Sequence, residues 1–262
     1  MDEKQLRKAL SDIPLGDIRY YHQAGSTNDI ALAWATEGAP DFSLVVADEQ
    51  TSGRGRMGRR WLTPPGSSLA MSLILRPTPH VREHISLLSG LGALALTQVL
   101  KEYELHAQIK WPNDILIGLR KTAGILVETV WMGDQVESGI IGIGVNVLPE
   151  SVPPATAVGF PATSIHSEGG KIDRLGLLHD LLERLIQLRP QIGTPDFVRA
   201  WEATLAFTDE EVQVWAEPGS GTLVESPLTG ILRGLESDGA LRLETSSGIQ
   251  LIQFGEIHLR PM

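Results

Sequence analysis

The segment Thr51-Ser-Gly-Arg-Gly-Arg-Met-Gly-Arg-Arg-Trp61 restricts the fold and function of this 262-residue chain more than any other stretch. Residues 53–61 (GRGRMGRRW) contain four arginines and three glycines. Glycine lets a backbone approach a ligand closely and adopt positive φ. Guanidinium groups present a fixed fork of donors to phosphate or carboxylate oxygens. The segment therefore predicts a cationic loop that closes over an anionic ligand.

The same loop has two alternative interpretations. Residues 53–58 match the pattern GxGxxG and follow a predicted strand at 43–50, as in a dinucleotide-binding site. That motif must open a helix and be followed by an acidic residue about 20 positions later. Here Pro64-Pro65-Gly66 prevents a helix, and residues 73–75 are Leu-Ile-Leu. A solvated basic loop or an RNA-binding patch stays open on this segment alone.

The composition narrows the function classes. The net charge is -10, which argues against a broad nucleic-acid-binding surface but leaves room for one local basic site. The absence of cysteine excludes disulfides, thiolate metal sites and cysteine nucleophiles. The charged N-terminus is no signal peptide, and the uncharged run 85–100 is too short and polar to span a membrane. We expect a cytoplasmic protein with no membrane segment.

The pattern of apolar residues predicts two domains, at 1–208 and 209–262. Ser26 begins a predicted helix as its cap, with Asp29 completing a capping box and Gly38 ending the helix. Further strands are predicted at 43–50, 68–76, 108–111, 115–117, 123–131 and 139–147, and further helices at 84–102, 172–189 (capped by Asp173) and 196–205. After residue 208, short alternating runs at 212–216, 230–235, 240–244 and 249–254, with a hairpin signal at Asp238-Gly239, predict a small antiparallel barrel.

Three more motifs lie between the loop and residue 150. In KWPND (110–114), a lysine and an aromatic residue precede a turn between strands; the alternative is an ordinary turn. In KTAGILVE (121–128), Lys121 precedes an apolar strand and could equally be a surface lysine. In GIGVN (142–146), glycines within a strand indicate that a backbone or ligand comes close, or that the strand carries a bulge. The sequence contains neither the zinc-protease motif HExxH nor the serine-hydrolase motif GxSxG, so it gives no support for either class of hydrolase.

In this order, and together with Ser26-Thr27-Asn28 and Gln50, these motifs resemble the biotin protein ligase family. The resemblance spans about residues 20–150. Lipoate ligases share the fold but are not expected to carry GRGRxGRxW. The resemblance implies an α+β fold: a class II aminoacyl-tRNA-synthetase-like catalytic domain, with a mixed sheet and helices on one side, followed by an SH3-like β-barrel.

The resemblance also implies an activity. The family couples biotin and ATP to biotinyl-5′-AMP and pyrophosphate, with Mg²⁺ expected on the ATP and no metal ligand from the protein. It then transfers biotin to one lysine of a biotin carboxyl carrier protein. The implied ligand-contacting residues are Ser26, Thr27, Asn28 and Gln50 at the biotin ureido end, Arg54, Gly55, Arg56 and Trp61 in the closing loop, Lys110 and Lys121 at the phosphates and reacting carboxylate, Gly124, Asn113, Asp114 and Asn146 along the nucleotide and acceptor-lysine side, and Arg260 reaching back to the nucleotide.

The residues fit that chemistry. A biotin carboxylate must attack an α-phosphate, so the cations Arg54, Arg56, Lys110 and Lys121 would offset the repulsion between two anions. A glycine-rich loop would exclude the water that destroys a mixed anhydride. The acceptor lysine arrives protonated, since its ordinary pKa is about 10.4. Asp114 is the candidate to accept that proton.

Some members of the family carry a DNA-binding domain ahead of the catalytic domain. Only about 25 residues precede the Ser-Thr-Asn motif here, so we expect a monofunctional ligase without operator binding. Two rival functions stay open: a lipoate-type acyl ligase, and a biotin-sensing module that binds biotinyl-AMP without efficient transfer. The chain could be a monomer or a homodimer.

Overall fold

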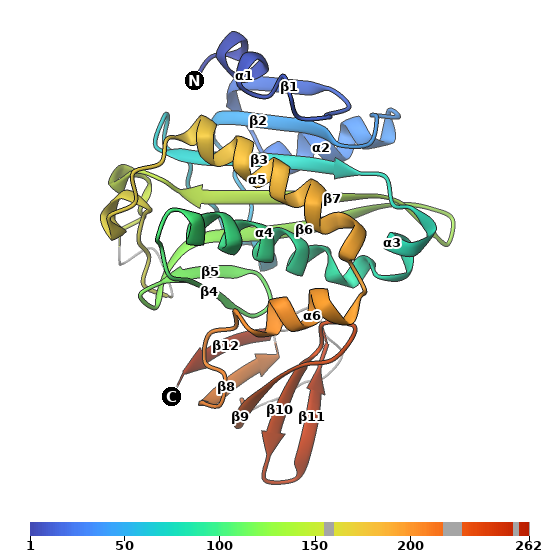
Figure 1. Cartoon of the computed structure of the whole chain (residues 1–262), viewed down its shortest axis with the longest axis vertical. Helices are drawn as coiled ribbons and strands as arrows, with labels where there is room; N and C mark the ends of the chain where they lie inside the picture. The colour runs from blue at the N-terminus through green and yellow to red at the C-terminus, as the bar shows by residue number, and fades with distance from the viewer. Residues whose placement is uncertain (155–159, 217–226, 254–256, 262) are drawn as a thin grey trace.

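The computed structural model describes residues 1–154, 160–216, 227–253 and 257–261, with the backbone alone for 215–216 and 257–261. Over this part of the chain, the larger sheet has the strand order β1-β2-β3-β7-β6-β5-β4 (Figure 1). Its strands are β1 (Ile18–Ala24), β2 (Ser43–Gln50), β3 (Ser68–Leu75), β4 (Ala107–Lys110), β5 (Asp114–Ile117), β6 (Arg120–Met132) and β7 (Gln135–Asn146). β1 and β2 are parallel and the other described neighbours are antiparallel, so the sheet is mixed as predicted.

Helices cover both faces of this sheet, which corrects the prediction of one covered face. The helices are α1 (Glu3–Ala9), α2 (Thr27–Thr36), α3 (Pro79–Glu83), α4 (Leu88–Glu102), α5 (Arg174–Leu188) and α6 (Pro195–Glu202). Ile141 and Ile143 of β7 belong to the core that contains the leucines of α4 and α5. Ile140 packs instead with Ala31 and Trp34 of α2. Because side chains alternate along a strand, α2 lies on the opposite face.

The helix after Ser26 begins and ends where predicted, but the predicted capping box is not formed. Ser26 is the N-cap residue, yet its side chain makes no capping hydrogen bond among the described residues. The Oε1 atom of Gln50 accepts from the Thr27 amide instead, at 2.8 Å. The helix stops before Gly38, whose φ of 90° is in the left-handed region. The cap is therefore supplied by a neighbouring strand, and the predicted capping box is wrong.

The long helix predicted at 84–102 is divided. A 3₁₀ turn at Ile85–Leu87 precedes α4, which begins at Leu88. Leu88 packs so closely on β7 that a Cβ at Gly139 would lie 2.5 Å from its Cδ1 atom. The tighter turn brings the chain onto the sheet at this point. The prediction also missed α1, β1 and α3, which are short elements with little apolar periodicity.

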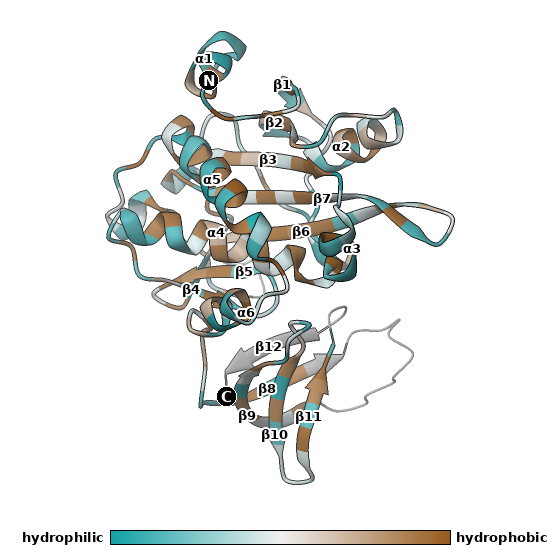
Figure 2. Cartoon of the chain, turned by 45° about the vertical axis from the view of Figure 1, so that its right-hand side comes forward, coloured by the Kyte–Doolittle hydropathy of each residue, from teal (hydrophilic) through white to brown (hydrophobic). Residues whose placement is uncertain are grey.

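α5 confirms its predicted start. The Asp173 side chain accepts from the Leu175 and Gly176 amides at 2.8 and 2.9 Å, which satisfies two amides of the first turn. Most of its leucines, including Leu177 and Leu181, are buried, while its outer side is hydrophilic (Figure 2). Burial of this leucine face against the sheet and α4 is the main stabilising contribution of the helix. No described helix is long and apolar enough to cross a membrane.

A second, antiparallel sheet follows α6, in the order β11-β10-β9-β8-β12 (Figure 1). Its strands are β8 (Glu211–Ala216), β9 (Leu228–Leu235), β10 (Leu241–Thr245), β11 (Gly248–Ile252) and β12 (Ile257–Pro261). Asp238-Gly239 turns the chain between β9 and β10 as predicted, with Gly239 at φ 83°. The domain boundary placed at residue 208 falls in the connection between α6 and β8. The turn between β4 and β5 contacts the turn between β9 and β10, where the Trp111 indole Nε1 donates to the Gly239 carbonyl at 3.0 Å.

Candidate active site

A cavity of about 690 Å³ opens on the face of the sheet that carries α2. This volume is within the usual range for a small-molecule site. It is lined by all predicted site residues whose side chains are described: Ser26, Thr27, Asn28, Gln50, Arg54, Gly55, Arg56, Trp61, Lys110, Asn113, Asp114, Lys121, Gly124 and Asn146. The structure thus brings together motifs that lie up to 120 residues apart in the sequence.

One end of the cavity is lined by uncharged polar side chains at the start of α2. Gln50 Oε1 accepts from the Thr27 hydroxyl at 3.1 Å as well as from the Thr27 amide, and Gln50 Nε2 donates to the Thr63 hydroxyl at 3.1 Å. The Ser72 hydroxyl on β3 donates to Asn28 Oδ1 at 2.6 Å and lies 2.8 Å from the Thr27 hydroxyl. These bonds fix the rotamers of side chains that could bind a small polar group.

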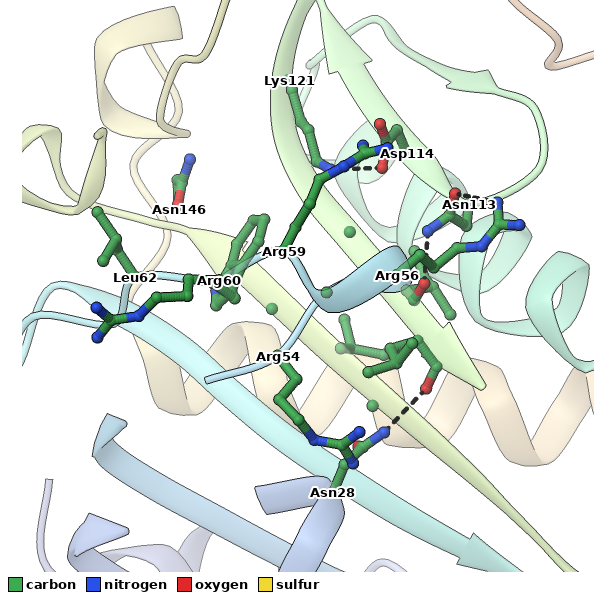
Figure 3. Close-up of a pocket in the computed structure, with 18 of the residues that line it drawn as sticks. Asn28, Arg54, Arg56, Arg59, Arg60, Leu62, Asn113, Asp114, Lys121 and Asn146 are labelled. Atoms are coloured by element: carbon green, nitrogen blue, oxygen red, sulfur yellow. Dashed lines mark hydrogen bonds and ion pairs between the residues drawn. The ribbon is translucent and has the colours of Figure 1, made fainter. Parts of the chain in front are cut away.

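A charged cluster borders this polar end. Arg54 of the loop donates through Nη2 to Glu128 Oε2 at 2.6 Å and to Asp29 Oδ1 at 2.7 Å. Asn28 Nδ2 donates to the same Glu128 oxygen at 2.8 Å. Burial acts to lower the pKa of Arg54, but the two carboxylates outweigh it and raise that pKa. Arg54 is therefore paired with protein carboxylates and lies away from Lys121 (Figure 3). Its predicted role at the reacting anions stays a prediction.

The glycines of β7 make room for the site, as the GIGVN motif predicted. β3 and β7 pair in regular register from Ser68 to Leu75, so the alternative of a bulge is wrong there. A Cβ at Gly142 would lie 2.1 Å from Asn28 Oδ1, and one at Gly144 would lie 2.4 Å from Trp61 Nε1. Only glycine allows these two side chains to contact the sheet so closely.

The other end of the cavity holds an ion-pair cluster in the KWPND hairpin. Lys110 ends β4 and pairs across the turn with Asp114, the first residue of β5. The Asp114 carboxylate lies 2.6 Å from Lys121 Nζ and 3.7 Å from Lys110 Nζ. Burial acts to raise the pKa of Asp114, but the two ammonium groups and Arg59 outweigh it and hold that pKa below its ordinary value. The carboxylate is therefore ionised and anchors both lysines.

Further contacts place the remaining motif residues around this cluster. Arg56 Nη1 lies 3.5 Å from Asn113 Oδ1, and Asn113 Nδ2 donates to the Ile125 carbonyl at 2.8 Å. Asn146 Nδ2 donates to the Thr163 carbonyl at 3.0 Å. Lys121 Nζ lies 5.6 Å from the centre of the Trp61 ring, within the range of a cation–π contact. The loop and the lysine end of the cavity are thus in contact through Trp61.

Comparison with known proteins identifies the family. The biotin/lipoate A/B protein ligase family model matches residues 21–146, and the biotin protein ligase C-terminal domain model matches residues 223–260. The chain is 36% identical over 265 residues to the bifunctional ligase/repressor BirA of Bacillus subtilis, covering 99% of this chain and 79% of that protein. It is also 36% identical over 242 residues to the biotin–[acetyl-CoA-carboxylase] ligase of Paracoccus denitrificans, covering 88% of this chain and 96% of that one. The chain belongs to the biotin protein ligase family.

A solved structure agrees with this assignment. The biotin protein ligase from Aquifex aeolicus in complex with biotin and ATP superposes with a TM-score of 0.78 and 29% identity, covering 94% of this chain and 99% of that chain. The predicted family, its ligase class and the α+β fold with an SH3-like C-terminal domain are therefore confirmed. The roles of individual residues stay predictions. Arg260 lies in β12, outside the described side chains, so its contact with nucleotide also stays a prediction.

The family motifs did not indicate every residue that shapes the site. Glu128 ends the KTAGILVE motif, but nothing in its spacing showed that it would meet Arg54 and Asn28. Ser72 was one small residue in an apolar strand. Arg59 lies in the loop motif without a predicted role, and its side chain reaches toward Asp114 beside Lys121 (Figure 3). A polar residue on the cavity face of a buried strand is the signal that could have identified Glu128 and Ser72.

Proposed function

We propose that this chain activates biotin with ATP to biotinyl-5′-AMP and then transfers biotin to a lysine of a biotin carboxyl carrier domain. Membership of the biotin protein ligase family supports biotin ligation. The observation that carries the proposal is the polarity of the cavity. A neutral hydrogen-bonding cluster at Thr27 and Gln50 suits the ureido group, and the cationic cluster at Lys110 and Lys121 suits phosphates.

In the first step, an oxygen of the biotin carboxylate attacks the α-phosphorus of ATP, and pyrophosphate leaves. Two anions must approach each other, so cations at the reacting centre lower the barrier. Lys121 and Lys110 supply them, and Asp114 holds both ammonium groups in place before substrate arrives. Preorganised charge of this kind needs no rearrangement during the reaction.

Mg²⁺ fits this site as part of Mg-ATP. The described residues hold no group of three or more His, Asp or Glu side chains able to bind a metal, and the Asp114 carboxylate is committed to two lysines. The ion would be held chiefly by phosphate oxygens, where it neutralises charge.

The adenylate must then be kept from water. The loop folds back on itself through the hydrogen bond from the Trp61 amide to the Gly53 carbonyl, at 2.8 Å. This places the Trp61 ring against Gly144 at the floor of the cavity. A closed loop over the mixed anhydride excludes water until the carrier lysine arrives.

In the second step, the lysine nitrogen attacks the carbonyl carbon of the adenylate, AMP leaves, and the lysine loses a proton. Asp114 is the proposed acceptor of that proton. Its lowered pKa makes the carboxylate a weak base, so we expect its larger contribution to come from positioning Lys121 and Lys110. Asp114→Asn tests the base role in single-turnover transfer from preformed adenylate, where an undiminished rate would exclude that role.

The proposal is tested with Mg-ATP, biotin and a biotin carboxyl carrier domain, followed by mass spectrometry of the carrier. We expect the carrier to gain one biotin and to gain nothing when biotin is replaced by lipoate. Transfer of lipoate would move the chain to the lipoate-type ligases. Formation of biotinyl-AMP without any transfer would favour the sensor alternative.

A further inference from the structure

Glu128 is a partly buried residue that contacts both the loop and the α2 end of the cavity. Its side chain is 25% exposed, and its Oε2 atom accepts from Arg54 Nη2 at 2.6 Å and from Asn28 Nδ2 at 2.8 Å. Arg54 comes from the loop, Asn28 from α2 and Glu128 from β6, so one carboxylate oxygen joins three elements that are distant in sequence.

Asn28 is held by these bonds rather than free to donate to a ligand. Its Nδ2 atom donates to Glu128 and, at 3.3 Å, to the Leu126 carbonyl, while its Oδ1 atom accepts from the Ser72 hydroxyl at 2.6 Å. Both amide hydrogens of the side chain are therefore used within the protein. The Asn28 amide therefore connects the start of α2, at the polar end of the cavity, to strands of the sheet.

Fixing the Arg54 side chain also fixes the loop. Arg54 pairs with Arg60 across the loop in an antiparallel bridge, and the Gly55 amide donates to the Arg59 carbonyl at 2.7 Å. Trp61 follows directly and reaches the floor of the cavity at Gly144. Anchoring Arg54 therefore anchors both sides of the loop and the ring that contacts the cavity floor.

β6 carries this anchor at one end of the cavity and Lys121 at the other. The Lys121 side chain folds back along the strand, because its Nζ atom lies 3.4 Å from where a Cβ of Gly124 would be. Four positions of strand, or roughly 13 Å, therefore lie between this ammonium group and the backbone of Glu128. A ligand with a ureido ring at one end and a phosphate at the other has a similar length. If the proposed function holds, substitutions at Glu128 should change the binding of biotin and of its adenylate rather than the binding of ATP.

We infer that Glu128 is a positioning residue that latches the Arg54 side of the loop over the biotin end of the cavity and thereby sets how long biotinyl-AMP stays bound. It acts through Arg54 and Asn28 and does not touch the reacting atoms. Asp29 is the secondary partner, because it is 56% exposed and its attraction for Arg54 is more strongly screened by solvent.

The test is Glu128→Gln, which keeps the shape of the side chain and removes its charge. Charge-assisted hydrogen bonds are about twice as strong as neutral ones. We expect biotinyl-AMP to dissociate about tenfold faster and the KM for biotin to rise about tenfold, with the KM for Mg-ATP changed by less than about twofold. Dissociation from the wild-type enzyme should accelerate with salt more than dissociation from the variant, since the wild type retains the ion pair.

The matched control is Glu137→Gln. Glu137 lies on the adjacent strand and pairs with Arg76 at 2.9 Å outside the cavity, so the control removes a carboxylate from a similar ion pair. It should leave all three quantities unchanged. Arg54→Gln removes the same latch from the loop side, and it should reproduce the faster dissociation even if Glu128→Gln folds poorly.

Two results would overturn the inference. One is unchanged dissociation of biotinyl-AMP in both Glu128→Gln and Arg54→Gln. The other is an equal rise in the KM values for biotin and ATP, which would indicate general damage to the fold. Both are measured against an active wild-type enzyme, so they are distinct from a failure of the proposed function, in which the wild type itself would show no biotin-dependent turnover.

Discussion

Gly142 and Gly144 lie two residues apart on the same face of β7, yet replacing each by alanine should affect different properties: stability at Gly142 and activity at Gly144. Both have negative φ, so alanine causes no backbone strain at either position. The difference lies in what each new methyl group would meet. At Gly142 it meets the Asn28 amide, and at Gly144 it meets the Trp61 indole.

The cost at Gly142 follows from how firmly Asn28 is held. The methyl group would lie 2.1 Å from Asn28 Oδ1, and that amide is tied to Ser72 and Glu128. Overpacking typically costs about 1–3 kcal/mol. Losing one hydrogen bond to a charged group adds about 1.5–3 kcal/mol. Replacing glycine by alanine returns about 0.4–1 kcal/mol through the unfolded chain. We expect a net loss of about 3 kcal/mol, or roughly 6–12 °C in Tm for a chain of this size.

At Gly144 the obstacle can move. Trp61 belongs to the loop, and its Nε1 atom has no hydrogen-bond partner among the described residues. Moving the ring outward therefore breaks no hydrogen bond of the indole. We expect Gly144→Ala to lower stability by less than about 1 kcal/mol, but to displace the ring from the cavity floor and slow adenylate formation by about tenfold or more.

The assay is thermal unfolding by circular dichroism, paired with biotin-dependent pyrophosphate release for each variant. The reasoning predicts a marked fall in Tm for Gly142→Ala and a loss of activity at nearly unchanged Tm for Gly144→Ala. A Gly142→Ala variant that unfolds within about 1 °C of the wild type would refute the argument. So would a Gly144→Ala variant that is destabilised as strongly as Gly142→Ala.

Two further predictions concern the stability of the fold. Trp111→Phe removes the N–H that donates to the Gly239 carbonyl and leaves that buried carbonyl without its hydrogen bond. We therefore expect the free energy of unfolding, measured in urea, to fall by about 1–2 kcal/mol. An unchanged midpoint of urea unfolding would contradict this expectation. Hydrogen bonds to Asp12 and Asp180 raise the pKa of His179 above its ordinary value of 6.5. The stability that this provides is fully present below about pH 6.5 and is lost as the pH rises through the folded-state pKa. The difference in the free energy of unfolding between the wild type and His179→Gln should therefore shrink as the pH is raised above 6.5. If the two free energies, plotted against pH, ran parallel, the contact of His179 with Asp12 and Asp180 would contribute nothing.

Local sequence signals predicted the elements whose causes are local. The Asp173 cap and the Asp238-Gly239 turn both depend on residues within three positions of each other, and both are present in the structure. The capping box at Ser26 failed because a glutamine 23 residues away from Thr27 takes its place. Propensity and periodicity describe neighbours in the chain, so they cannot anticipate a partner supplied by another strand.

The same distinction applies to the site. The family motifs indicated which residues line the cavity, because the motifs and their order can be recognised in the sequence alone. They did not indicate that Arg54 is neutralised by Glu128, 74 residues away, or that α2 lies on the face opposite α4. These facts depend on which side of a strand each residue occupies once the sheet is assembled.

The central claim is that the cavity joins biotin to AMP, and it is tested most directly by exchange of radiolabelled pyrophosphate into ATP without any carrier present. The account predicts exchange that depends on biotin, is absent with lipoate, and falls steeply in Lys121→Met, because that variant loses the cation held by Asp114. Exchange that proceeds without biotin, or that Lys121→Met leaves intact, would contradict it.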